Sequence, residues 1–138
     1  MAAIRPPESF NHVAIPAEDR VKSKAELLAA AYAAFNARNI DAVLTMMHPD
    51  VDWANGMEGG RVHGHKGVRD YWERQWASID PHVEALRFTT DEAERIVVDV
   101  HQVVRDLSGK VLSDRMVQHV YIIEDNLIQR MDINKATA

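Results

Sequence analysis

The chain has 138 residues, of which 46% are hydrophobic and 27% charged, as expected of one soluble globular domain rather than a disordered or fibrous protein. The absence of cysteine excludes disulfides and thiolate metal sites, and 16 basic residues scattered among 21 acidic ones argue against nucleic acid or an anionic membrane as a partner. No apolar run approaches the roughly 20 residues of a membrane helix, and no secretory signal is recognisable, so we expect a cytoplasmic protein.

Residues 1–21 are predicted to form an extension that precedes a single domain over residues 22–138. Three prolines interrupt any regular pattern in the extension. The segment is either disordered or an arm that docks its apolar residues, Phe10, Val13 and Ile15, on the domain. The sequence leaves both alternatives open.

Three helices are predicted. The first begins at Ser23, because residues 23–26 match a capping box and apolar residues then follow at helical spacing. The second is capped by Asp41, runs through Met47 and is stopped by a proline. The third runs from about Lys66 to the end of an apolar and aromatic face made of Val68, Tyr71, Trp72, Trp76 and Ile79.

Strands dominate the rest of the chain. A short strand over 51–53 precedes a glycine-rich turn over 55–60. Longer strands are expected over residues 83–90, 95–107, 111–124 and 127–133, separated by turn residues. Helices followed by a run of strands indicate an α+β domain, in which a helical layer over a curved sheet would enclose a one-ended pocket.

Four segments resemble the nuclear transport factor 2-like superfamily, with the SnoaL-like subset, kin to ketosteroid isomerase, as the nearest match. Residues 35–43 resemble its helix junction, 48–53 its first strand, 61–69 the start of its third helix and 119–132 its last hairpin. The resemblance covers about residues 22–134. It implies a cone-shaped fold in which three N-terminal helices pack on a strongly curved, mostly antiparallel sheet around an internal pocket. It implies little about function, because the superfamily includes isomerases, cyclases, epoxide hydrolases, dehydratases and non-catalytic binding proteins.

The resemblance argues against the activity of a standard ketosteroid isomerase. Where that enzyme has its aspartate base this chain has Asn55, where it has a tyrosine on the first helix this chain has Ala31, and where it has a protonated aspartic acid this chain has Gln118. An amide cannot accept a proton from a carbon acid at neutral pH, so the mechanism does not transfer. Asn55 and Gln118 remain candidates for holding a carbonyl or hydroxyl group by hydrogen bonds.

Asp99 and His101 are the candidate acid–base pair, because alternate residues of a strand share one face. The family register directs this face into the pocket, where His101 would transfer a proton while Asp99 or Asp132 orients it. The hydrophobic pattern favours the opposite arrangement, with Val98 and Val100 in the core and the polar pair in solvent. The two readings agree if a homodimer through the outer sheet face buries the valines, and we adopt that interpretation.

The remaining candidates would surround the substrate. Arg130, paired with Asp132, is expected to point inward by family register and either to brace the sheet or to polarise the substrate. Trp53 and Trp72 would enclose the body of the substrate, and His63 would lie at the pocket rim. No metal is expected, because His63 and its neighbouring histidine lack a third ligand.

Two functions therefore remain open. The first is a small enzyme of isomerase, cyclase, dehydratase or hydrolase type that acts by acid–base chemistry, without a cofactor, on a small apolar metabolite. The second is a non-catalytic module for small-molecule binding or dimerisation that has lost the ancestral acids.

Overall fold

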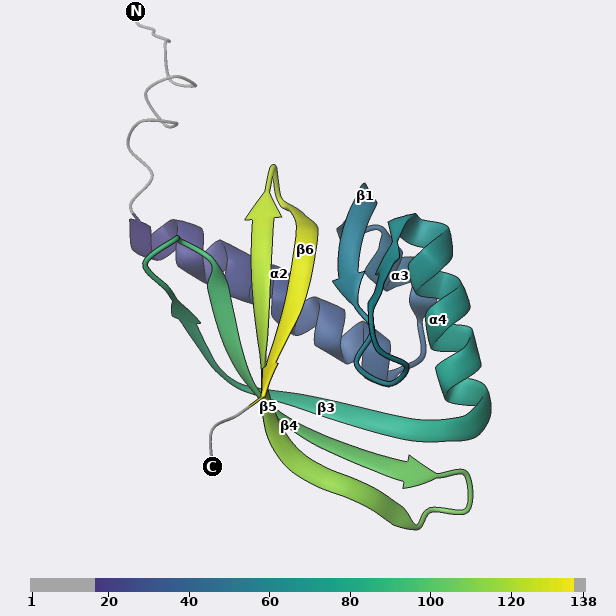
Figure 1. Ribbon diagram of the computed structural model, residues 1–138. Coiled ribbons are helices and arrows are strands. Elements are labelled where there is room, and N and C mark those ends of the chain that lie inside the picture. The colour runs from purple at the N-terminus through teal and green to yellow at the C-terminus, as the bar shows by residue number, and fades with distance from the viewer. Residues whose placement is uncertain (1–16, 136–138) are drawn as a thin grey trace, which may run out of the picture.

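The computed structural model describes residues 17–135, which form three helices over one side of a curved six-stranded sheet (Figure 1). The helices are α2 (Ala17–Asn36), α3 (Ile40–Leu44) and α4 (Gly64–Ser78). The strands are β1 (Met47–Ala54), β2 (Arg61–His63), β3 (Ile79–Thr90), β4 (Ile96–Asp106), β5 (Val111–Glu124) and β6 (Leu127–Lys135). The predicted α+β class and the mostly antiparallel sheet are confirmed. The predicted docking of an N-terminal arm falls outside the described residues.

The starts of the first two helices differ from the prediction. Ser23 lies inside α2, which already begins at Ala17, because no helix-breaking residue separates the two positions. The boundary proposed after residue 21 therefore falls within a helix. Asn39, and not Asp41, caps α3: its side-chain oxygen accepts a hydrogen bond from the backbone nitrogen of Ala42 at 3.2 Å.

The sheet has the order β2-β1-β6-β5-β4-β3, and all neighbouring strands are antiparallel except β1 and β6. The β5–β6 hairpin turns through Asp125 and Asn126, whose φ angles of 54° and 62° suit the two-residue turn that the sequence indicates. In Figure 1 the long strands β3, β4 and β5 bend away from the rest of the sheet, while α2 and α4 lie across its hollow side.

The valines of β4 face the helices. Val98 and Val100 are completely buried in the core, whereas Asp99 and His101 lie on the opposite, outer face of the sheet. The prediction that a homodimer hides the valines while the polar pair enters the pocket is wrong. Burying a valine side chain contributes about 1.5–3 kcal/mol, whereas burying an unpaired carboxylate is costly, so packing follows the hydrophobic pattern.

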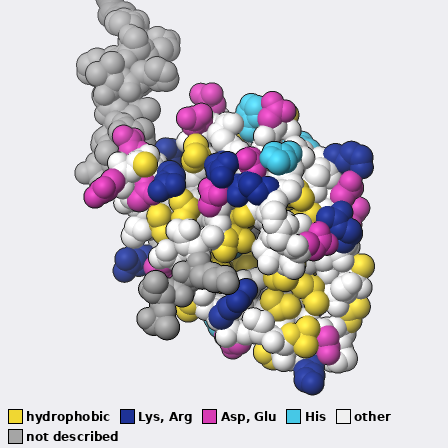
Figure 2. All heavy atoms as spheres, in the orientation of Figure 1, with side chains coloured by type: hydrophobic (Ala, Val, Ile, Leu, Met, Phe, Trp, Pro, Cys, Tyr) yellow, Lys and Arg dark blue, Asp and Glu magenta, His cyan; other side chains and the backbone are white. Residues whose placement is uncertain are grey.

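The homodimer itself stays a prediction, although its original reason no longer holds. Large hydrophobic side chains are exposed near the β4–β5 hairpin, at Leu107, Val111 and Leu112. On the face shown in Figure 2, hydrophobic side chains gather in the middle and towards the lower right.

Within residues 17–135, no helix combines the length and the apolar character that crossing a membrane requires.

Candidate functional site

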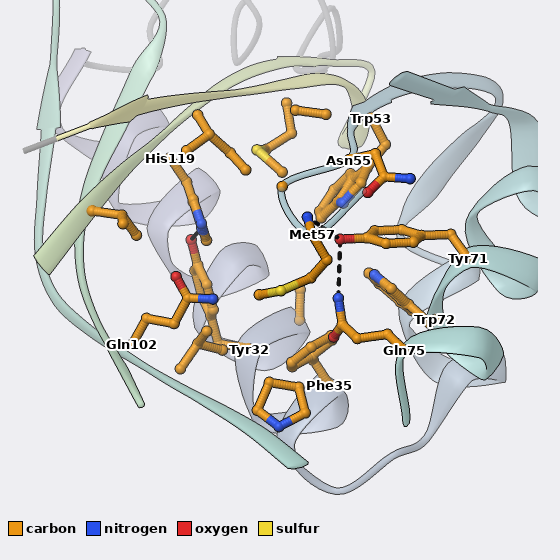
Figure 3. A pocket seen from close by; sticks show the side chains of 18 of the residues that line it. Tyr32, Phe35, Trp53, Asn55, Met57, Tyr71, Trp72, Gln75, Gln102 and His119 are labelled. Carbon is orange, nitrogen blue, oxygen red and sulfur yellow. Dashed lines mark hydrogen bonds between the residues drawn. The ribbon is translucent and has the colours of Figure 1, made fainter. Parts of the chain in front are cut away.

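A mostly apolar cavity of about 290 Å³ lies between the helical layer and the curved sheet (Figure 3). Its walls contain aromatic and aliphatic side chains together with a few polar ones. Among the predicted site residues, Trp53, Asn55 and Trp72 line it, and their contact with a ligand stays a prediction. The complete lining is Ala31, Tyr32, Phe35, Val43, Trp53, Ala54, Asn55, Gly56, Met57, Tyr71, Trp72, Gln75, Pro81, Val83, Gln102, Arg115, Val117, His119, Tyr121, Met131 and Ile133.

A chain of three hydrogen-bonding side chains forms one wall of the cavity. Tyr32 lies on the buried face of α2, and His119 and Tyr121 alternate along the inner face of β5. The Tyr121 hydroxyl donates to the Tyr32 hydroxyl at 2.8 Å, and the Tyr32 oxygen lies 2.8 Å from His119 Nδ1. The Tyr32 and His119 rings are also nearly parallel, at an interplanar angle of 7°. Helix and sheet thus meet through a continuous polar chain inside an apolar cavity.

Burial determines the protonation of these three groups. It lowers the pKa of His119 to about 4 and raises the pKa of both Tyr32 and Tyr121, so all three are neutral at pH 7. Because the Tyr32 oxygen accepts a hydrogen bond from Tyr121, the Tyr32 hydroxyl donates its own hydrogen bond to Nδ1 of His119. The single proton of the neutral imidazole then lies on Nε2. That nitrogen bonds to no other group of the described residues and remains available to a ligand.

A second polar group lies across the cavity from His119, with Met57 between them (Figure 3). The Tyr71 hydroxyl accepts hydrogen bonds from Gln75 Nε2 at 2.9 Å and from the backbone nitrogen of Met57 at 3.3 Å. Asn55 is engaged locally: its Nδ2 donates to Glu58 Oε1 at 2.9 Å, and its Oδ1 accepts from the Glu58 backbone nitrogen at 2.7 Å. The bond between Met57 and Tyr71 holds the glycine-rich turn against α4. The two bonds to Glu58 occupy both ends of the Asn55 amide.

Three predicted residues lie on the outer face of the sheet instead of in the cavity. Gln118 donates to Asp99 at 2.8 Å, and the two residues face each other across β4 and β5. His101 Nε2 lies 2.7 Å from Asp114 Oδ1, and about a third of the His101 side chain is exposed. The predicted placement of Asp99, His101 and Gln118 in the pocket is therefore wrong, because their neighbours along the strands, Val98, Val100, Val117 and His119, occupy the inner positions.

Arg130 and Asp132 also face outward, in an ion cluster that joins β1, β2 and β6. Both arginines of the cluster, Arg61 and Arg130, bind both carboxylates, Asp52 and Asp132. His63 lies beside Asp52 at 3.5 Å, is largely exposed and is not part of the cavity lining. The inward placement predicted for Arg130 and Asp132 is wrong, and so is the rim position predicted for His63. The mutual ion pair predicted for Arg130 and Asp132 is confirmed.

Asp132→Asn is expected to lower the free energy of unfolding by about 1 kcal/mol at pH 7, because the exchange weakens two partly exposed ion pairs. The hydrogen bond from Arg130 lowers the pKa of Asp132, so the contribution is present at neutral pH and is lost as the carboxylate is protonated in acid. Urea unfolding at pH 7 and pH 3 measures both effects. Asp114→Asn serves as the control, and an equal loss in both variants would contradict a bracing role of the cluster.

Tyr32 and His119 each directly follow a residue that the family register selected, Ala31 and Gln118 respectively. A shift of one residue along a strand exchanges its two faces, so the register error on β5 selected Gln118 on the outer face in place of His119 on the inner face. The signal that favours the observed face was present in the sequence, because His119 alternates with Val117 and Tyr121.

No Asp or Glu side chain is among the residues that line the cavity in the described part of the chain. Across residues 17–135, no three His, Asp or Glu side chains come together in a way that could hold a metal ion. The described lining therefore offers hydrogen bonding from neutral groups and one cationic side chain, Arg115, but no carboxylate. His119 Nε2 provides a donor, and the Tyr71 hydroxyl lies on the opposite wall.

Comparisons with known proteins agree on the fold. Residues 28–131 match the sequence model of the SnoaL-like domain. The crystal structure of TerC, co-crystallised with polyporic acid, is 26% identical, with a TM-score of 0.72 over 83% of this chain and 92% of that one. An NTF2-like protein of unknown function from Burkholderia pseudomallei K96243 is 25% identical, with a TM-score of 0.72 over 83% and 91% of the two chains.

A more distant structure shares the fold alone. The epoxide hydrolase/cyclase-like enzyme SalBIII, described in pyran ring formation in the polyether salinomycin, is 12% identical, with a TM-score of 0.70 over 84% of this chain and 92% of that one. A comparison with curated proteins finds no match.

Proposed function

Because the chain belongs to the SnoaL-like family of the nuclear transport factor 2-like superfamily, we propose that its cavity binds a small apolar metabolite. A carbonyl or hydroxyl oxygen of this metabolite accepts a hydrogen bond from Nε2 of His119. The observation that carries the proposal is the chain from Tyr121 through Tyr32 to His119, which ends on a donor directed at an apolar cavity.

The size and lining of the cavity support this ligand class. A volume of about 290 Å³ is near the lower end of small-molecule sites, and apolar walls with a few convergent polar groups are typical of them. Rings of Trp53, Tyr71 and Trp72 suit a flat, aromatic or polycyclic body. The crystallisation of the related TerC with polyporic acid supports the same class.

The hydrogen-bonded chain favours polarisation of a substrate oxygen over outright proton transfer. If Nε2 gave up its proton completely, replacement along the chain would leave a buried tyrosinate, and burial already raises the pKa of Tyr121. A fixed donor beside a carbonyl oxygen stabilises the negative charge that develops there during cyclisation, isomerisation or dehydration. This chemistry needs no cofactor.

A non-catalytic binding module is the second candidate. The described lining residues include no carboxylate base, which favours this candidate. His119 is also a weak base, because its pKa of about 4 lies far below neutral pH. A substrate with an ordinary, weakly acidic C–H bond would find no effective base in this cavity.

Binding of polyporic acid and of a panel of polycyclic hydroxyketones, measured by isothermal titration calorimetry, tests the proposal. His119→Phe keeps an aromatic ring but removes the donor, and we expect at least a tenfold loss of affinity, about the effect of one buried hydrogen bond. His101→Ala is the matched control on the same sheet and should bind like the wild type. Unchanged affinity in His119→Phe, or no binding by the wild type, would contradict the proposal.

Turnover of the same panel separates the two candidates. Conversion of a bound compound by the wild type, reduced in His119→Phe, supports the enzyme. Binding without conversion of any compound supports the module. Circular dichroism of each variant ensures that lost affinity does not reflect lost folding.

A further inference from the structure

Arg115 is the one charged side chain among the residues that line the cavity in the described part of the chain. All other lining residues there are apolar or neutral. Arg115 is an exposed residue of β5 that lines the cavity, so it carries its charge towards the solvent end of the cavity. The cavity is therefore electrically asymmetric, with a positive charge towards solvent and neutral hydrogen-bonding groups inside.

The strand register places this charge in line with His119. Arg115, Val117 and His119 share the inner face of β5, and Arg115 pairs with Gln102 of β4, which also lines the cavity. Four residues of extended strand separate the α-carbons of Arg115 and His119 by about 13 Å. A rigid ligand of two or three rings can span most of that distance between the two side chains.

Asp114, the acid next to Arg115 in sequence, is engaged elsewhere. Asp114 points to the outer face and bonds to His101, which also lies near Glu84. None of the ion pairs found among residues 17–135 includes Arg115. Its neighbour across the strand pair, Gln102, is neutral and can donate a further hydrogen bond. The guanidinium thus keeps its capacity for an anion from outside the described chain.

We propose that the natural ligand is amphipathic, with a carboxylate that Arg115 binds at the mouth of the cavity while an oxygen at the other end reaches His119. Gln102 supports the carboxylate by donating from its amide. A planar guanidinium suits two parallel hydrogen bonds to a carboxylate, and the apolar wall beside it reduces competition from water. This inference rests on the proposed function, because it assumes that a ligand enters this cavity.

The test compares 4′-hydroxybiphenyl-4-carboxylic acid with its methyl ester by isothermal titration calorimetry at pH 7. The two probes share the ring system and the hydroxyl group and differ only in the negative charge. We expect the wild type to bind the acid at least fivefold more tightly than the ester. Arg115→Gln should abolish this preference mainly by weakening binding of the acid. Arg87→Gln removes the same charge from an exposed position beside Asp99, outside the cavity lining, and should retain the preference.

The outcomes separate this inference from the proposed function. If the wild type binds both probes equally, or if Arg115→Gln keeps the preference, the role of Arg115 is overturned, while binding that depends on His119 still supports the proposed function. If both arginine variants lose the preference equally, the effect is one of overall charge and the inference is again overturned. If the wild type binds neither probe, both proposals fail for this ligand class.

Discussion

Lowering the pH from 7 to 4.5 is expected to destabilise the wild type by about 2 kcal/mol more than a His119→Gln variant. In the folded protein, burial lowers the pKa of His119 to about 4, whereas the unfolded chain titrates near the ordinary histidine value of about 6.5. The unfolded state therefore binds more protons between these values. The contribution of His119 to stability is fully present above about pH 6.5, declines as the pH falls, and is lost below about pH 4.

Urea unfolding monitored by tryptophan fluorescence at both pH values measures this difference. Glutamine does not titrate, and its amide can still accept a hydrogen bond from Tyr32, so the variant isolates the proton-linked part of the effect. Other titrating groups are common to both proteins and cancel in the comparison. Equal pH dependence in the two proteins would show that His119 is accessible to protons in the folded state, and it would remove the basis for a neutral donor in the cavity.

Val100→Asn is expected to lower the free energy of unfolding by about 3–4 kcal/mol, whereas His101→Asn should change it by less than about 1 kcal/mol. Both substitutions introduce the same side chain at neighbouring positions of β4. Val100 is completely buried, so the asparagine amide there loses its hydrogen bonds to water without gaining a hydrogen-bond partner, and the core loses apolar contacts. At His101 the amide remains partly in solvent and can still bond to Asp114.

Denaturant unfolding of the two variants and of the wild type measures both changes in the free energy of unfolding. If Val100→Asn does not fold, its yield of soluble protein and its circular dichroism spectrum report the same outcome. A larger loss in His101→Asn than in Val100→Asn would mean that the polar face of β4 is the buried one, and the assignment of the cavity to the His119 face would then be wrong.

Local signals in the sequence were sufficient for most of the elements. The strand predicted over 111–124 coincides with β5, and Asp125 with Asn126 forms the predicted turn, because positive φ angles at such a turn are supplied by these residue types. Two predictions failed: α3 ends at Leu44 instead of running through Met47, where β1 begins, and β2 was not predicted as a strand. Strand β2 has only three residues, and its pairing with β1 is a tertiary contact that no local sequence pattern indicates.

The candidate site depended on more than local signals. The aromatic residues Trp53 and Trp72 were assigned to the pocket through the family resemblance, and the structure places both in the cavity lining. The polar residues were assigned through an assumed register, and a register error of one residue exchanged Tyr32 for Ala31 and His119 for Gln118. On β5 such an error reverses the face, so Gln118 was assigned to the pocket although it lies on the outer side of the sheet; on α2 both Ala31 and Tyr32 line the cavity.

The sequence by itself determined the α+β class, the long strands and the identity of the apolar face of β4, because each depends on propensity and periodicity within one segment. Only the tertiary structure decided that Tyr32 of α2 meets His119 and Tyr121 of β5 inside the cavity. Tyr32 lies more than 80 positions from either strand residue in the sequence. The contact arises because the curved sheet packs under α2. The burial that keeps His119 neutral exists only once that packing is complete.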